Sequence, residues 1–293
     1  MKVTELWKSS KKPTVSFELF PARSAKAAEG LEKTIDEIAA LKPDFVSVTF
    51  GAGGSTREGS YNLVKKLIKD KGLRTVAYFT CYGLGPSDIK AVLDSYRDLG
   101  VETILAARGD PPHDQPDFKP HPESLAHASD LVAFVRPRYD FCIAAAGYPE
   151  KHIEAQSPEK DREYLKLKVE NGADFVVTNY FYDNKSFFEF EDHCRKLGIK
   201  VPLLPGVMPI YSVKMMENLA ALCGATISQE IRDGIAKLPA GDAGTLQAFG
   251  VDFALDQCRG LLKHGVPGLH FYTMDRSAAV VPIVRRLRDE GLL

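Results

Sequence analysis

The sequence lacks the cysteine pairs that mark a disulfide framework or a zinc site. Its five cysteines are odd in number, widely spaced and never arranged as CxxC, so we expect most of them to be small core residues. They are Cys81, Cys142, Cys194, Cys223 and Cys258. No segment sustains the apolar run that crosses a bilayer, and the first residues lack the apolar core of a signal peptide. We therefore expect a soluble, cytoplasmic protein without a membrane partner.

Several nucleotide-binding and catalytic motifs are also missing. There is no GxGxxG, no GxxxxGK[ST] and no GxSxG, so neither a Rossmann fingerprint, a P-loop nor a serine elbow is indicated. No His, Asp and Glu cluster has the spacing of metal ligands, which predicts no metal site. The 38 basic and 39 acidic residues give a net charge of -1, which offers nucleic acid no attractive field.

What the chain does contain is a regular alternation of short β-rich runs and amphipathic helical stretches. Strands are predicted at 15–20, 45–50, 75–80, 103–107, 141–145, 175–180, 203–207 and 268–272. Helices between them include 27–41, 61–71, 87–99, 161–171 and 187–197. Eight strands with intervening helices over 293 residues favour a closed (β/α)8 TIM barrel of the α/β class. No linker divides the chain, so residues 1–293 are expected to form a single domain with an insertion at about 227–244.

The run Ser16-Phe17-Glu18-Leu19-Phe20-Pro21 places an acid in the middle of an apolar strand. Successive side chains of a strand point to opposite faces, so Glu18 lies on the other face from Phe17 and Leu19. We expect Glu18 to be buried or to line a pocket. Burial raises the pKa of a carboxyl group, which would make Glu18 a proton donor near neutral pH. The alternative is a structural glutamate paired with a buried cation.

Polar residues follow most of the predicted strands, where the active sites of such barrels lie. They include Thr49, Arg108, Gly109, Asp110, Tyr148, His152, Asn179 and Arg276. Two guanidinium groups, an amide, carboxyl groups and aromatic rings together suit a planar, polar, anionic ligand.

The same strand ends carry a series of longer motifs. In order these are SFELFPAR, VSVTFGAGGSTRE, AARGDPP, AGYPEKHIEA, ENGADFVVTNYFYDN, PLLPGVMPI and GLHFYTMDR. From about residue 15 to 287 the chain resembles the 5,10-methylenetetrahydrofolate reductase family, in particular its bacterial single-domain type. The resemblance implies a (β/α)8 barrel that carries FAD, which agrees with the order of elements above. It also implies a homo-oligomer.

The implied reaction reduces 5,10-methylenetetrahydrofolate to 5-methyltetrahydrofolate, with NADH or NADPH as the hydride donor. Opening of the bridged substrate makes folate N10 a leaving group, and an arylamine leaves well only when an acid protonates it. Glu18 matches the family's general acid. Asp110 matches the acid near the flavin and the pterin, where its charge would favour the N5 iminium ion.

The resemblance implies two further sets of site residues. The positions for the cofactor are Thr49, Ala52, Tyr78, Arg108, Gly109, Asp110, His127, Ala128, Tyr148, His152, Ala155, Asp161 and Lys168. The positions for the folate are Glu18, Asp110, Asn179, Met215, Leu219 and Arg276.

Several of these positions depart from the family pattern. Tyr78 replaces a common histidine at the flavin, His127 stands near a usual tyrosine, and Asn179 replaces a glutamine. Tyr164 and Leu167 replace an Asn and an Arg near the phosphate and ribose of the cofactor. Met215 replaces a glutamine, and Leu219 replaces an aromatic residue that stacks on the folate. Two alternatives follow, namely a flavin-independent folate reductase with direct hydride transfer, and a catalytically weakened folate-binding paralogue.

Overall fold

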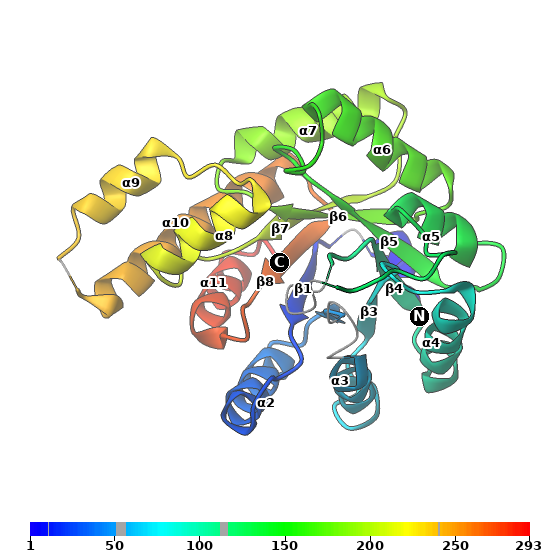
Figure 1. Ribbon diagram of the computed structural model, residues 1–293. Coiled ribbons are helices and arrows are strands. Elements are labelled where there is room, and N and C mark those ends of the chain that lie inside the picture. The colour runs from blue at the N-terminus through cyan, green and yellow to red at the C-terminus, as the bar shows by residue number, and fades with distance from the viewer. Residues whose placement is uncertain (11, 51–56, 112–116, 240) are drawn as a thin grey trace.

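A closed parallel β-barrel forms the centre of the molecule. The computed structural model describes residues 1–10, 12–50, 57–111, 117–239 and 241–293. Within them the strands follow chain order around the barrel, and each pairs in parallel with its neighbours (Figure 1). The strands are β1 (Thr14–Leu19), β2 (Phe45–Val48), β3 (Thr75–Thr80), β4 (Thr103–Ala107), β5 (Cys142–Gly147), β6 (Phe175–Tyr180), β7 (Leu203–Val207) and β8 (Gly268–Tyr272). The predicted (β/α)8 TIM barrel is confirmed.

Helices cover the outside of the barrel. They are α1 (Val3–Ser9), α2 (Ala25–Ala40), α3 (Arg57–Lys69), α4 (Pro86–Leu99), α5 (Ala128–Val135), α6 (Pro158–Glu170), α7 (Asn184–Lys196), α8 (Val213–Cys223), α9 (Gln229–Ala236), α10 (Ala243–His264) and α11 (Ser277–Asp289). The connection from β7 to β8 is the long one and carries α8, α9 and α10. The segment 227–244, expected as an insertion, contains α9, which lies farthest from the barrel in Figure 1.

The main core lies between the barrel and its helices. Phe17 and Leu19 of β1 face this layer and are fully buried. A second apolar cluster fills the amino-terminal end of the barrel, where α1 closes it with Val3 and Trp7. The Trp7 ring meets Phe175 edge to face at a centroid distance of 5.2 Å. This plug leaves the carboxyl end of the barrel as the open one.

Local sequence signals account for several element ends. Gly100 ends α4 in the left-handed conformation, with φ at 94°, as the Leu99-Gly100-Val101 pattern predicts. Four cysteines, Cys81, Cys142, Cys194 and Cys258, are buried and free, as expected of small core residues. No helix in the described part of the chain combines the length and apolarity that a membrane span requires.

Gly206 on β7 lies where the barrel has no room for the Cβ atom of any larger residue. A Cβ on Gly206 would lie 2.3 Å from the Thr178 carbonyl oxygen and 2.5 Å from the Tyr272 ring. We expect Gly206→Ala to lower the free energy of unfolding by about 1 to 3 kcal/mol, because overpacking forces the backbone apart. The matched control is Gly30→Ala on exposed α2, where a Cβ meets nothing within 4 Å. It should stabilise the protein by up to about 1 kcal/mol. Urea unfolding measures both, and equal effects of the two substitutions would contradict this account.

Candidate active site

Glu18 lies inside the barrel on β1, where its register partners are Ser47 on β2 and Tyr272 on β8. Its side chain is buried, with 4% of the residue exposed. Burial raises the pKa of Glu18 to about 8, the nearby charge of Asp275 raises it further, and a hydrogen bond with the Tyr78 hydroxyl opposes the rise. The acid therefore holds its proton at neutral pH, as the strand pattern predicted. No permanent cation is among the groups that set this pKa, so the structural ion-pair reading is not supported.

A chain of hydrogen bonds runs below the acid, across the barrel interior. The Ser16 hydroxyl donates to the Leu269 carbonyl oxygen at 3.2 Å, so it accepts from Nδ1–H of His270 at 2.8 Å. This assignment leaves Nε2 of His270 as the acceptor for the Ser47 hydroxyl at 3.4 Å. Burial lowers the pKa of His270 to about 3, so the ring is neutral. The Tyr78 hydroxyl lies within hydrogen-bond reach of both Ser47 and Glu18, so it connects this chain to the acid.

The turn after β8 clamps the strand that carries the acid. The Thr273 hydroxyl donates to the backbone oxygen of Glu18 at 2.6 Å, and the backbone N–H of Phe20 donates to the Asp275 carboxylate at 2.9 Å. Met274 and Asp275 have φ angles of 49° and 55°, a conformation that costs most residues free energy. Burial raises the pKa of Asp275 to about 6, so this carboxyl is largely ionised at pH 7 while Glu18 is not. Sequence reasoning did not select Asp275, although an acid directly after a barrel strand is a usable signal.

Beside the barrel mouth lies a cavity of about 370 Å³, between the ends of β4 and β5 and the helices α5 and α6. Most of the residues predicted to contact the cofactor line it. They are Arg108, His127, Ala128, Tyr148, His152, Ala155, Asp161 and Lys168. Tyr164 and Leu167 also line the cavity. The structure thus brings together residues that span about sixty positions of sequence.

Lys168 contributes a buried, positively charged ammonium group to this cavity. Its ammonium donates to the carbonyl oxygen of Ala146 at 2.8 Å, and its side chain remains accessible from the cavity. Burial lowers the pKa of Lys168 to about 8, and the charge of Asp161 opposes the shift. The carbonyl oxygen of Ala146 offsets the positive charge of this ammonium only in part. The cavity therefore favours an anionic ligand group such as a phosphate. The donor set therefore fits the pyrophosphate of a dinucleotide such as FAD.

At the mouth, Arg108 forms a two-pronged ion pair with Glu154, with N···O distances of 2.6 and 3.1 Å. It also reaches Asp110 at 3.4 Å, a longer contact than those with Glu154. Gly109 between them has φ at 81°, and a Cβ there would lie 2.7 Å from Thr80. Glycine is therefore required where the backbone turns into the mouth. Sequence reasoning missed Glu154, which carries no local signal of its partner.

Four of the residues predicted for the folate lie on or after β6, β7 and β8, namely Asn179, Met215, Leu219 and Arg276. Asn179 is the last residue but one of β6, and its side chain hydrogen-bonds with Cys223 of α8. Leu219, also on α8, packs in an apolar cluster with Tyr180, Tyr182, Met208 and Ile231. The Arg276 guanidinium lies 5.9 Å from the ring centre of Tyr211. Met215 is the third residue of α8 and is half-buried.

Four of the described residues predicted for the cofactor do not line the cavity beside the mouth, namely Thr49, Tyr78, Gly109 and Asp110. Thr49 follows β2, and its backbone N–H donates to Leu19 at 3.1 Å. Tyr78 points into the barrel, towards Glu18. Ala52 lies outside the described residues. Their contacts with a cofactor stay predictions.

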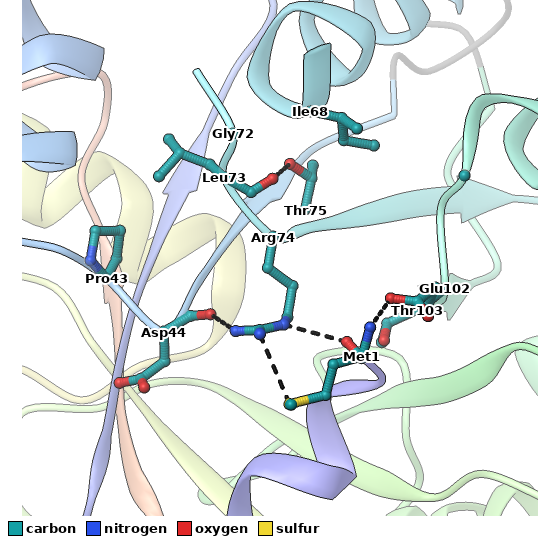
Figure 2. Close-up of a pocket in the computed structure, with 11 residues that line it drawn as sticks. Met1, Pro43, Asp44, Ile68, Gly72, Leu73, Arg74, Thr75, Glu102 and Thr103 are labelled. Atoms are coloured by element: carbon teal, nitrogen blue, oxygen red, sulfur yellow. Dashed lines mark hydrogen bonds and ion pairs between the residues drawn. The ribbon is translucent and has the colours of Figure 1, made fainter. Parts of the chain in front are cut away.

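A second cavity, of about 340 Å³, lies at the other end of the barrel, before β2, β3 and β4. Figure 2 shows that its polar groups turn towards one another. Arg74 donates to the backbone oxygens of Asp44 and Met1, and the amino group of Met1 pairs with Glu102. This cavity therefore lies between the amino terminus of the chain and the starts of β2, β3 and β4, at the closed end of the barrel. Over the residues that the structure describes, no cluster of His, Cys, Asp and Glu could hold a metal ion.

Comparison with known proteins identifies relatives that cover most of the chain. The profile of the methylenetetrahydrofolate reductase family matches residues 2–288. A 5,10-methylenetetrahydrofolate reductase of Escherichia coli is 35% identical over 266 residues, which are 90% of this chain and 86% of that one. Methylenetetrahydrofolate reductase (NADH) 1 of Arabidopsis thaliana is 35% identical over 283 residues, 93% of this chain. The chain spans about half the length of that plant relative, 48%.

Among solved structures, an uncharacterized protein from Clostridium thermocellum that binds two copies of 5-methyl-5,6,7,8-tetrahydrofolic acid shares the fold. It has a TM-score of 0.66, 13% identity, and coverage of 98% of this chain and 99% of its own. At that identity the likeness concerns the fold. The family match over nearly the whole chain is the stronger finding. The chain belongs to the methylenetetrahydrofolate reductase family.

Proposed function

We propose that this protein is a flavin-dependent reductase that converts 5,10-methylenetetrahydrofolate to 5-methyltetrahydrofolate with NADH or NADPH. The observation that carries the proposal is the buried, protonated carboxyl of Glu18 at the barrel mouth. The family match and the cavity with eight of the implied cofactor residues support it. The Arabidopsis relative is a methylenetetrahydrofolate reductase (NADH), which favours NADH as the donor here. A homo-oligomeric, cytoplasmic protein remains an expectation from the family.

The cavity between α5 and α6 would hold FAD. Lys168 would pair with the pyrophosphate, while Arg108 and Tyr148 would border the isoalloxazine at the barrel mouth. FAD, when bound, supplies hydride transfer from the nicotinamide nucleotide to the methylene carbon of the folate. The protein's part is to bind and orient both molecules and to manage the proton.

Glu18 would provide that proton. As the bond between N10 and the methylene carbon of the folate breaks, the carboxyl proton passes to N10, and N5 forms an iminium ion with the carbon. The hydroxyl of Tyr78 would then donate to the new carboxylate, which spares a buried charge from being left without a partner. The negative charges of Asp275 and Asp110 would favour the cationic iminium electrostatically.

Asn179, Met215, Leu219 and Arg276 would position the folate on the β6 to β8 side. Arg276 offers a cation to an acidic group of the substrate and is held over the Tyr211 ring. The amide of Asn179 is one methylene shorter than the usual glutamine and already contacts Cys223. A water molecule or a shifted pterin would have to make up the missing length of this contact.

One observation favours a second candidate function, a flavin-independent reductase. Tyr78, at a position where the family commonly places a flavin-contacting histidine, turns towards Glu18 and lies outside the cavity. Direct hydride transfer from the nicotinamide would need the same acid. Activity of a colourless preparation that does not respond to added FAD would favour this candidate.

The primary test is the absorbance spectrum of the purified protein under anaerobic conditions. We expect a yellow protein that NADH bleaches and that methylenetetrahydrofolate restores. Lys168→Met should weaken FAD binding by about 10- to 100-fold, because a charge-assisted contact to phosphate is lost. Lys160→Met on the same helix is the control, since Lys160 is exposed and pairs with Glu163 at 2.6 Å. A wild-type protein that binds no flavin would refute the proposal.

A further inference from the structure

The outer wall of the cavity beside the mouth carries two apolar side chains that the fold does not bury. Tyr164 and Leu167 of α6 are 54% and 42% exposed, and both line the cavity. They lie three positions apart, so their side chains stand next to each other on one face of the helix. Few large apolar residues of the described chain are as exposed as these. We call this pair of side chains the apolar platform.

The helix itself does not need the platform. It packs against the barrel through other residues, Arg162 and Leu165, which are buried. Its exposed charges pair with one another along the helix, as Lys160 does with Glu163 at 2.6 Å. The apolar surface of the platform is therefore left for something that enters the cavity, because exposing it to water is unfavourable.

The lining of the cavity runs from half-buried to exposed residues: Arg108, Tyr148 and Lys168 are half-buried, whereas Tyr164 and Leu167 are exposed. Arg108 and Tyr148 lie at the mouth, and Lys168 offers its enclosed ammonium from α6. Tyr164 precedes Lys168 by four positions, one turn of the helix, and continues the same wall. Across the cavity, the start of α5 supplies His127 and Ala128, and Figure 1 shows α5 and α6 side by side outside the barrel.

A ligand that matches this order has a phosphate near its middle and a flat, weakly polar ring at its outer end. We propose that Tyr164 and Leu167 form the binding site for the adenine ring of the dinucleotide, with the phenol ring of Tyr164 stacked on the purine. Aromatic rings stack on bases through their faces and need no exact hydrogen-bond partner. The inference rests on the proposed flavin function, and it assigns a specificity role to two residues that lack the polar groups usual at these positions.

The consequence is a preference for FAD over shorter flavins. FMN and riboflavin lack adenine and cannot use the platform, whereas FMN still presents a phosphate to Lys168. Loss of one base-stacking residue commonly weakens binding by about 10- to 100-fold. The platform should therefore affect FAD affinity alone, and Lys168 should affect both FAD and FMN.

The experiment titrates the apoprotein with FAD, FMN and riboflavin and follows flavin fluorescence. Tyr164→Ala and Leu167→Ser are expected to weaken FAD binding at least about tenfold and to leave FMN binding within about twofold. Tyr164→Phe retains the ring and should bind FAD as the wild type does. Glu163→Ala, on the same exposed helix, is the matched control. Circular dichroism and thermal melting establish that each variant is folded.

The outcomes separate the inference from the proposal on which it rests. FAD binding that is unchanged in Tyr164→Ala, or FAD and FMN binding that fall together, would overturn the adenine site and leave the flavoprotein proposal standing. A wild-type protein that binds none of the three flavins would refute both. Loss confined to FAD, with rescue by Tyr164→Phe, would establish the site.

Discussion

Glu18→Gln is expected to slow reduction of methylenetetrahydrofolate by about 10²- to 10⁴-fold, the usual contribution of a positioned general acid. The amide keeps the shape of the protonated carboxyl but cannot transfer a proton to N10. Reduction of the bound flavin by NADH needs no such proton and should keep its rate. Anaerobic stopped-flow absorbance measures the two half-reactions separately.

The pH dependence gives this prediction its specific signature. Because the pKa of Glu18 is about 8, the wild-type folate half-reaction should fall as the pH rises through about 8. Among the described residues, the titratable groups that interact with the carboxyl include Tyr78, Tyr272, Asp275 and Cys223, and burial raises the pKa of the Cys223 thiol above its usual value of 9. The pKa values of both tyrosines lie well above 10, and that of Asp275 is about 6, so none of them should produce this alkaline limb.

Two controls make the kinetic result interpretable. Glu18→Asp keeps an acid at the site and should recover part of the lost rate, with an alkaline limb still present. Glu163→Gln removes an exposed carboxyl on α6 and should leave both half-reactions unchanged. Equal slowing of both half-reactions in Glu18→Gln would reject a dedicated proton donor and would point to a general disturbance of the site.

The second large effect concerns stability, and its sign follows from the same pKa. The native protein holds the Glu18 proton up to about pH 8, whereas the unfolded chain releases it near 4.5. Between these values the native state binds more protons than the unfolded state, so stability falls as the pH rises. The loss is about 3 kcal/mol at pH 7 and about 5 kcal/mol above pH 8, as upper values.

Glu18→Gln should remove this loss, since glutamine has no charge to bury. The variant should be more stable than the wild type by up to about 3 kcal/mol at pH 7, with no difference near pH 4. Urea unfolding at pH 4.5, 7 and 8.5 measures the difference. The exposed substitution Glu163→Gln should change the unfolding free energy by less than about 0.5 kcal/mol at each pH. A gap for Glu18→Gln that does not widen with pH would show that the carboxyl is not buried in solution.

Glu18→Gln is expected to slow the folate half-reaction and to stabilise the fold, and both effects have one cause. A carboxyl that is costly to ionise keeps its proton for the substrate, and the same cost is subtracted from the stability of the fold. Active sites commonly carry such a cost, because the surrounding structure holds the group in place. Here the clamp from Thr273 and Asp275 holds the strand that carries Glu18.

Much of the architecture could be predicted from local pattern. The predicted bounds 75–80, 103–107, 175–180, 203–207 and 268–272 are those of β3, β4, β6, β7 and β8. The predicted strand 45–50 ends earlier, at Val48, and 141–145 extends to Gly147. Strand ends are harder to predict than strands, because the last residues pair or fray according to their neighbours in the sheet.

The site was predictable in part, and for different reasons. The side of β1 on which Glu18 lies follows from the alternation of side chains along a strand, with Phe17 and Leu19 outside. The residues of the cavity beside the mouth came from motifs, since nothing local indicates that His127 and Lys168 share a wall. The sequence did not indicate Glu154 and Asp275 as site residues, because their partners, Arg108 and Phe20, are distant in sequence.

The sequence by itself determined the order of strands and helices, the apolar layer around the barrel and the inward position of Glu18. These depend on periodicities of two and about 3.6 residues, which are local properties of a chain. Tertiary structure alone decided how strongly the acid holds its proton, that Tyr78 faces the acid, and that Asp275 lies beside β1. Those features require closure of the barrel, which brings β8 against β1 across more than 250 residues. Burial and register arise at that contact, and no short stretch of sequence encodes them.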